Sequence, residues 1–192
     1  AWAGFWSIPV VPGSILGIEF MLARLVNQHD PTPQASLRQF LVAWVGELFV
    51  ALKVFGWWMP FRSRVCSDQW KSVAPGRRGV IVIHGFICNR GIWTPWLVAL
   101  RAQGNPCVAL NLEPVFASID HYAAQIETAV SRMTAATGCT PLLVCHSMGG
   151  LAVRAWLRAA GPGAEERVFH VITLGTPHHG TCMSRFGISA SA

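Results

Sequence analysis

Residues 141–153 read Pro-Leu-Leu-Val-Cys-His-Ser-Met-Gly-Gly-Leu-Ala-Val, and this stretch decides the fold prediction. Residues 141–145 form a short apolar run typical of a buried strand, and a helical pattern follows over residues 148–160. Ser147 lies at the junction between them. A sharp strand-to-helix turn lifts a serine hydroxyl clear of the sheet, where it can attack a carbonyl carbon.

Strands and helices alternate on both sides of this junction. Strands are expected at residues 80–83, 106–112, 141–145 and 168–174, and helices at residues 92–102, 119–137 and 148–160. In the second of these helices, one apolar face is predicted from the spacing of Tyr122, Ile126, Ala129, Val130 and Met133. This alternation predicts an α/β protein with a mostly parallel sheet and helices on both of its faces.

Three short polar signals each follow a predicted strand. They are His84-Gly85-Phe86, the turn at Ser147, and Gly-Thr-Pro-His-His-Gly at residues 175–180. Open parallel sheets place their sites at the carboxyl ends of the strands. We therefore expect the three signals to meet in one site.

Residues 78–180 resemble the α/β-hydrolase family, and within it the bacterial lipase and esterase branch. The family motif is G-x-S-x-G, in which Ser147 matches the serine and Gly149 the second glycine, while Cys145 replaces the first glycine. The resemblance implies that Ser147 is the nucleophile. It also implies an oxyanion hole formed by the backbone N–H groups of Phe86 and Met148.

The neighbouring residues are expected to shape this site. Gly85 would let the backbone approach the substrate closely. His84 and His146 are interpreted as residues that hold the loops by hydrogen bonds. The resemblance implies that His178 lines the pocket and is not the catalytic base. No cofactor is implied, and the absence of a Cys-x-x-Cys pair argues against a zinc site.

The catalytic acid and histidine are not evident. In the family the order is nucleophile, acid, histidine, yet after Ser147 the only carboxylates are Glu165 and Glu166, beside a Gly-Pro-Gly turn. We therefore expect the acid and the histidine to lie beyond these 192 residues. A hydrolase lacking them retains only weak catalysis, so little turnover is expected from this chain alone.

The N-terminal part has a different composition. The chain is 52% hydrophobic and only 12% charged, whereas soluble domains are about 25% charged. Residues 1–18 carry no charge, so we predict a transmembrane helix over residues 1–26. A cleaved signal peptide is the alternative.

Residues 27–77 are expected to hold a linker and an interfacial helix, before a truncated hydrolase core at residues 78–192. The helix, at residues 37–59, is interrupted by Arg38, Glu47 and Lys53, which favours a place at the membrane surface, or packed on the first helix, over a span. The alternative is a helix buried against the globular domain.

The net charge of +6 comes from scattered arginines, which gives no support to nucleic-acid binding and favours membrane lipids as partners. Arg24 and Arg38 favour an inner-membrane protein with a cytoplasm-facing domain. The resulting hypothesis is a membrane-associated serine hydrolase of carboxylic esters, acting on an ester or lipid substrate. Thioesters, amides and acyl transfer stay open. The alternative is a non-catalytic, membrane-anchored binding protein on a hydrolase scaffold.

Overall fold

The computed structural model describes residues 2–31, 33–71 and 76–180. The chain forms two compact units, Ala1–Trp57 and Trp58–Ala192. Each is described by itself below.

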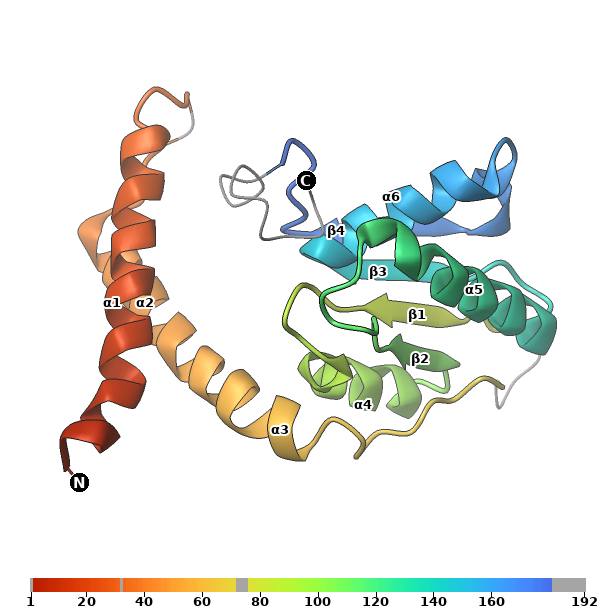
Figure 1. The fold of residues 1–192 in the computed structure, drawn as a ribbon, viewed down its shortest axis with the longest axis horizontal. Coiled ribbons are helices and arrows are strands. Elements are labelled where there is room, and N and C mark those ends of the chain that lie inside the picture. The colour runs from red at the N-terminus through yellow and green to blue at the C-terminus, as the bar shows by residue number, and fades with distance from the viewer. Residues whose placement is uncertain (1, 32, 72–75, 181–192) are drawn as a thin grey trace. The chain divides into compact units, whose positions relative to one another are not determined.

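A four-stranded parallel sheet forms the centre of the C-terminal unit (Figure 1). Its strands are β1 (Val80–Ile83), β2 (Cys107–Leu110), β3 (Leu142–His146) and β4 (His170–Leu174), in the spatial order β2-β1-β3-β4. Ile83 is in register with Leu110 of β2 and Cys145 of β3, so the carboxyl ends of the strands are level. The α/β prediction with a parallel sheet is confirmed.

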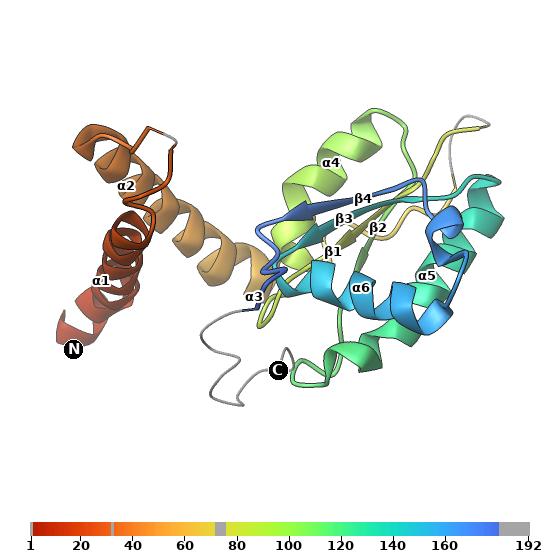
Figure 2. The ribbon, with the colours of Figure 1, turned by 90° about the horizontal axis from the view of Figure 1, so that it is seen from above.

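Helices cover both faces of this sheet (Figure 2). One face carries α4 (Thr94–Ala102), which follows the 3-10 turn Arg90–Trp93. The other carries α5 (Ala123–Thr137), after the 3-10 turn Ile119–Tyr122, and α6 (Met148–Ala160). A short 3-10 turn, Ala164–Arg167, leads into β4, and α3 (Met59–Phe61) opens the unit.

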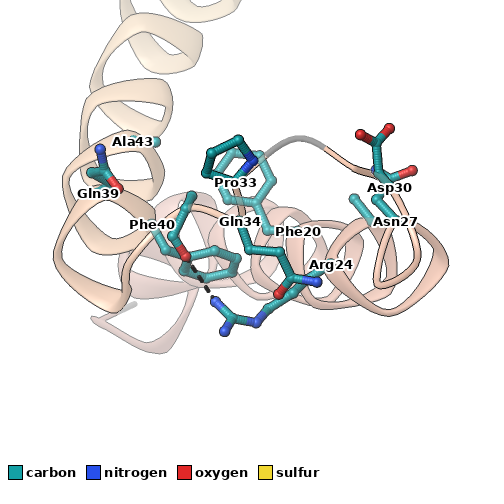
Figure 3. A pocket seen from close by; sticks show the side chains of 11 residues that line it. Phe20, Arg24, Asn27, Asp30, Pro33, Gln34, Gln39, Phe40 and Ala43 are labelled. Atoms are coloured by element: carbon teal, nitrogen blue, oxygen red, sulfur yellow. Dashed lines mark hydrogen bonds between the residues drawn. The ribbon is translucent and has the colours of Figure 1, made fainter.

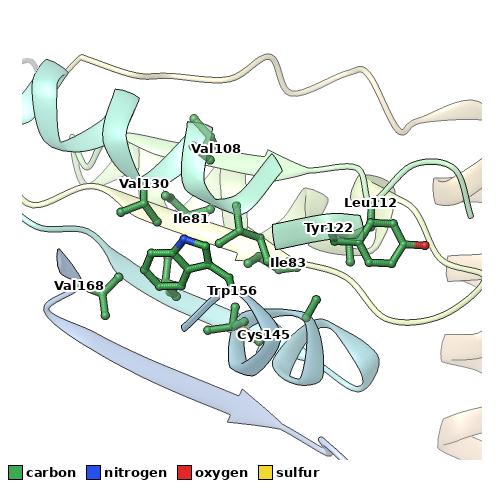
Figure 4. Packing of buried hydrophobic residues seen from close by; sticks show 14 of the residues in the cluster. Ile81, Ile83, Val108, Leu112, Tyr122, Val130, Cys145, Trp156 and Val168 are labelled. Atoms are coloured by element: carbon green, nitrogen blue, oxygen red, sulfur yellow. The ribbon is translucent and has the colours of Figure 1, made fainter. Parts of the chain in front are cut away.

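The larger core cluster fills the space between the sheet and the pair α5 and α6 (Figure 4). Ile81 and Ile83 point to this side, where Trp156 of α6 is almost fully buried. The five residues of the predicted apolar face on residues 119–137 are all buried here, which confirms that prediction. Alternate residues of β1, Val80 and Val82, point to the smaller cluster against α4.

The strand ends differ slightly from prediction. β2 ends at Leu110 and not at Leu112, because the Leu112 N–H donates to the His84 ring instead of joining the ladder. β4 begins at His170, since Val168 closes the preceding 3-10 turn.

The N-terminal unit contains two long helices, α1 (Trp2–Val26) and α2 (Leu37–Lys53). A π-helical turn, Val54–Trp58, continues α2 into α3. Ser36 caps α2: its hydroxyl accepts from the Gln39 N–H at 3.3 Å, while the Gln39 side chain accepts from the Ser36 N–H at 2.8 Å. Leu37–Phe61 is long and apolar enough to cross a membrane, by length and composition.

Candidate active site

Ser147 occupies the junction between β3 and α6 with φ 51° and ψ −125°. Among the described residues, it and Ile87 are the non-glycine residues with positive φ. Such a conformation costs about 1–3 kcal/mol and persists only where the surroundings enforce it. Strain of this kind gathers at functional sites.

Three hydrogen bonds hold Ser147 in this conformation. Its N–H donates to the Leu174 carbonyl at 2.9 Å, and its own carbonyl accepts from the Gly150 N–H at 3.1 Å. The Thr176 hydroxyl donates to the same carbonyl at 2.9 Å. The turn is therefore tied to the loop that follows β4.

Two glycines leave room for the turn. A Cβ on Gly85 would lie 2.8 Å from the Ser147 Cβ, and one on Gly149 would lie 2.7 Å from the His84 carbonyl oxygen. Real Cβ atoms essentially never approach so closely. Any other residue at either position would push the loop after β1 away from the serine turn.

Cys145, which replaces the first glycine of the family motif, is buried in β3. It belongs to the larger core cluster, so its small side chain is accommodated there. Burial raises the pKa of its thiol to about 12. The thiol therefore stays protonated near neutral pH and behaves as a small hydrophobic group.

Phe86 follows Gly85, which lies against the serine turn, in the loop after β1. The Cys88 N–H donates to the Gly85 carbonyl at 3.3 Å, which closes a tight turn around Phe86. Among the described residues, the N–H groups of Phe86 and Met148 have no acceptor. Met148 begins α6, whose first N–H groups lack helical partners and carry the positive end of the helix dipole.

His84 is buried, with 3% of its surface exposed, and both of its ring nitrogens contact the backbone. Nε2 accepts from the Leu112 N–H at 3.0 Å, so the proton is on Nδ1, which donates to the Gly85 carbonyl at 2.8 Å. Burial lowers the pKa of His84. A neutral His84 thus joins the loops after β1 and β2, and neither nitrogen is available to Ser147.

His146 ends β3 directly before the serine. Its Nδ1 is buried and has no hydrogen-bond partner among the described residues. A Cβ on Gly85 would lie 3.2 Å from that nitrogen, which places the ring against the loop after β1. Burial lowers the pKa of His146, so its neutral form is favoured.

His178 lies in the loop after β4. Its Nε2 is 3.3 Å from the Thr173 hydroxyl, and its carbonyl accepts from the Arg154 guanidinium at 3.2 Å. It lines a cavity of about 460 Å³ between this loop and α6, together with Leu151, Arg154, Arg158 and Pro177.

The structure therefore brings the three polar signals together at the carboxyl end of the sheet. In the described part of the chain, no histidine or carboxylate hydrogen-bonds to the Ser147 hydroxyl. Glu165 and Glu166 belong to the 3-10 turn before β4 and are exposed, at the opposite end of the strand. The described residues hold no group of three or more metal-ligating side chains.

Sequence reasoning missed Thr176 as a support of the serine turn. The residue was part of the Gly-Thr-Pro-His signal, which was interpreted only as a pocket lining. Its hydrogen bond to residue 147 spans 29 positions of sequence, and no local pattern reveals such a contact.

No protein-family model matches the chain, and a search of curated protein sequences found no match. Solved structures do match. Bacillus licheniformis lipase BlEst2 in its mature form is 23% identical, with a TM-score of 0.52, over 59% of this chain and 46% of the lipase. The chain has a partial α/β-hydrolase fold.

Two further structures agree. The propeptide form of the Bacillus licheniformis lipase is 22% identical, with a TM-score of 0.53, over 61% of this chain and 26% of that one. Aspergillus fumigatus lipase B is 18% identical, with a TM-score of 0.51, over 64% of this chain and 30% of that one. The chain spans less than half the length of each of these lipases. Identities this low show a common fold.

Proposed function

We propose that this protein is a serine hydrolase of carboxylic esters, with Ser147 as the nucleophile. The observation that carries the proposal is the strained Ser147 backbone between β3 and α6, held by Leu174, Gly150 and Thr176. A turn serine without a catalytic role has no need of this conformation.

The proposed chemistry uses the backbone beside Ser147. The Ser147 hydroxyl oxygen attacks the ester carbonyl carbon, and the resulting oxyanion accepts hydrogen bonds from the N–H groups of Phe86 and Met148. One such donor contributes about 3 kcal/mol of transition-state stabilisation. The alcohol leaves, and water then hydrolyses the acyl-enzyme.

The reaction also needs a general base to take the serine proton. Among the described residues, His84 is committed to backbone partners, and neither His146 nor His178 hydrogen-bonds to the serine hydroxyl. We therefore expect slow turnover from the 192-residue chain by itself.

Apolar side chains near the proposed oxyanion loop support an acyl substrate. Ile87 and Phe116 expose 58% and 78% of their surfaces, and the Phe86 ring packs edge-to-face on Phe116 at 5.9 Å. Exposed apolar groups next to a polar site suit a hydrocarbon chain. The neighbours in structure are named as lipases, and lipid esters are the substrate class that we propose.

The N-terminal unit is proposed to attach the protein to a membrane. Leu37–Phe61 is apolar enough to enter one, and none of its apolar window is buried. We place the protein at the inner membrane with the hydrolase unit facing the cytoplasm.

A non-catalytic binding protein is the second candidate. The observation in its favour is that no described histidine or carboxylate contacts the Ser147 hydroxyl. Such a protein would bind an ester without cleaving it.

A fluorophosphonate probe separates the two candidates, because it reacts covalently with an activated serine. The product of the whole gene should be labelled, and Ser147→Ala should abolish the labelling. Ser131→Ala, on the exposed surface of α5, is the matched control and should label normally. Labelling that survives Ser147→Ala would contradict the nucleophile assignment. A folded protein that binds esters but is never labelled would favour the binding protein.

A further inference from the structure

We propose that α1 and α2 both cross the lipid bilayer as a helical hairpin, with residues 27–36 on one side and residues 62 onward on the other. The proposal rests on the membrane attachment proposed above. It replaces the interfacial helix expected for residues 37–59 by a second span.

Both helices have the length of a span. α1 has 25 residues, and the helical segment Leu37–Phe61 also has 25. At about 1.5 Å per residue each is about 37 Å long, which exceeds the roughly 30 Å of bilayer hydrocarbon. α1 carries no charged residue before Glu19.

The surface of α2 has no polar face. None of its residues is buried, and exposed apolar side chains occur along its whole length, at Leu37, Leu41, Val42, Val45, Phe49, Val50 and Leu52. Arg38 and Glu47 are nine residues apart, about 180° around the helix, and Lys53 is about 120° from Glu47. An interfacial helix gathers its charges on one face. This distribution indicates that lipid hydrocarbon surrounds α2 on several sides.

The contact between the two helices is typical of packing in lipid. Gly13 and Gly17 of α1 lie one turn apart against Trp44 of α2, where a Cβ on Gly17 would be 3.4 Å from the indole nitrogen. That nitrogen donates to the Gly13 carbonyl at 2.8 Å. Membrane helices associate through small residues and interhelical hydrogen bonds of this kind. The rings of Phe20 and Phe40 pack edge-to-face at 5.2 Å nearer the connection.

The connection between the helices is polar, as expected for a segment in water. The Arg24 guanidinium donates to the Ala35 carbonyl at 3.0 Å. Both residues line a pocket beside the connection, which is also lined by Asn27, Asp30 and Gln39 (Figure 3). The opposite end of the hairpin has Trp2 and Trp6 at the start of α1 and Trp57 near the end of the second helix. Tryptophan is enriched at membrane–water interfaces.

The flanking charges give the direction of the hairpin. Residues 62–78 contain five basic residues and one acidic residue, a net charge of +4. The connection with its flanks, residues 24–38, contains two basic residues, Arg24 and Arg38, and one acidic residue, Asp30, a net charge of +1. Cytoplasmic flanks carry the excess of basic residues. The segment after Phe61 is therefore cytoplasmic and the 27–36 connection faces the other side.

Thiol labelling in membrane vesicles tests this topology, because all six cysteines lie between residues 66 and 182. A membrane-impermeant maleimide is added to right-side-out and inverted inner-membrane vesicles containing the full-length protein. In right-side-out vesicles the wild type should take up no label, and Gln34→Cys should add one label per chain. The matched control Ser63→Cys should add its label only in inverted vesicles.

The other outcomes each overturn a defined part of the proposal. A Gln34→Cys label that appears only in inverted vesicles, or only after detergent, would show that the connection does not reach the far side. Wild-type labelling in right-side-out vesicles would reverse the direction. Release of the protein by alkaline carbonate would contradict membrane attachment itself, and with it the earlier proposal, while leaving the Ser147 assignment intact.

Discussion

The backbone of Ser147 is held by groups that are distant in sequence. Leu174, the last residue of β4, and Thr176, in the loop after it, hydrogen-bond to Ser147, and Gly85 of the loop after β1 leaves no room for a side chain beside it. Each contact limits how far the turn can relax. The geometry of the hydroxyl thus depends on three strand ends at once, and small changes in the supports should alter reactivity more than global stability.

Gly85→Ala should weaken fluorophosphonate labelling strongly and destabilise the C-terminal unit by about 1–3 kcal/mol, the usual cost of overpacking. The new methyl group would lie 2.8 Å from the Ser147 Cβ, so one of the two loops must move. Labelling rates and urea unfolding of the detergent-solubilised protein provide the measurement. Gly46→Ala, where a Cβ has no neighbour within 4 Å, is the control. Normal labelling of Gly85→Ala would contradict the close approach.

The stability of the C-terminal unit should fall as the pH drops below about 6.5, the usual pKa of histidine. Burial lowers the pKa of His84 in the folded state, so the unfolded chain binds more protons between the two pKa values. Protonation also removes the Nε2 acceptor of the Leu112 N–H.

Urea midpoints measured between pH 8 and pH 5 test this expectation. His84→Gln should lower stability at pH 8 and flatten the decline toward pH 5. The residual slope belongs partly to His146, whose pKa is lowered by burial as well. An unchanged slope in His84→Gln would argue against a neutral, buried His84.

The two units differ in how much of their helices and strands is buried. β1 is buried on both faces, as a central parallel strand should be. β4 pairs with β3 only, among the described strands, and three of its five residues are exposed. α2 has no buried residue at all. The sheet thus has a buried central strand and a largely exposed edge strand, β4, while α1 and α2 meet through Gly13, Gly17 and Trp44.

Gly17→Ile should separate α1 from α2, because the added side chain would meet the Trp44 indole. Cross-linking of Phe20→Cys to Phe40→Cys by a short bifunctional maleimide reports the pairing, because the two wild-type rings meet at 5.2 Å. We expect the cross-linked fraction to fall several-fold. Gly46→Ile, on an open part of α2, should leave it unchanged. Equal cross-linking in both variants would contradict the packing of Gly17 on Trp44.

At the scale of the whole molecule, local patterns predicted the order and type of the elements in the C-terminal unit. The helix over residues 148–160 has the predicted limits. The helix predicted over residues 119–137 begins instead as a 3-10 turn and becomes α-helical at Ala123. These elements could be predicted because hydrophobic periodicity, and the glycines that mark the ends of helices and strands, depend only on neighbouring residues.

Only part of the candidate site could be predicted from the sequence. Ser147, Gly149 and the loop at residues 84–86 stand out by residue type and by their position after apolar runs. The sequence does not reveal that Thr176 supports the serine turn, because its partner is 29 residues away. It also does not reveal the two backbone partners of His84, because one is 28 residues away and both depend on how the ring is oriented. The choice between an interfacial and a spanning α2 likewise needed the distribution of exposed side chains and the contact of Gly13 and Gly17 with Trp44.

The sequence by itself determined a parallel α/β sheet, a serine at a strand-to-helix junction and a strongly apolar N-terminal part, since each follows from the order of neighbouring residues. Only the tertiary structure decided which groups surround that serine, which tautomer His84 adopts and how α1 packs on α2. The physical reason is that close packing and hydrogen bonding act between atoms brought together by the fold, whatever their separation along the chain.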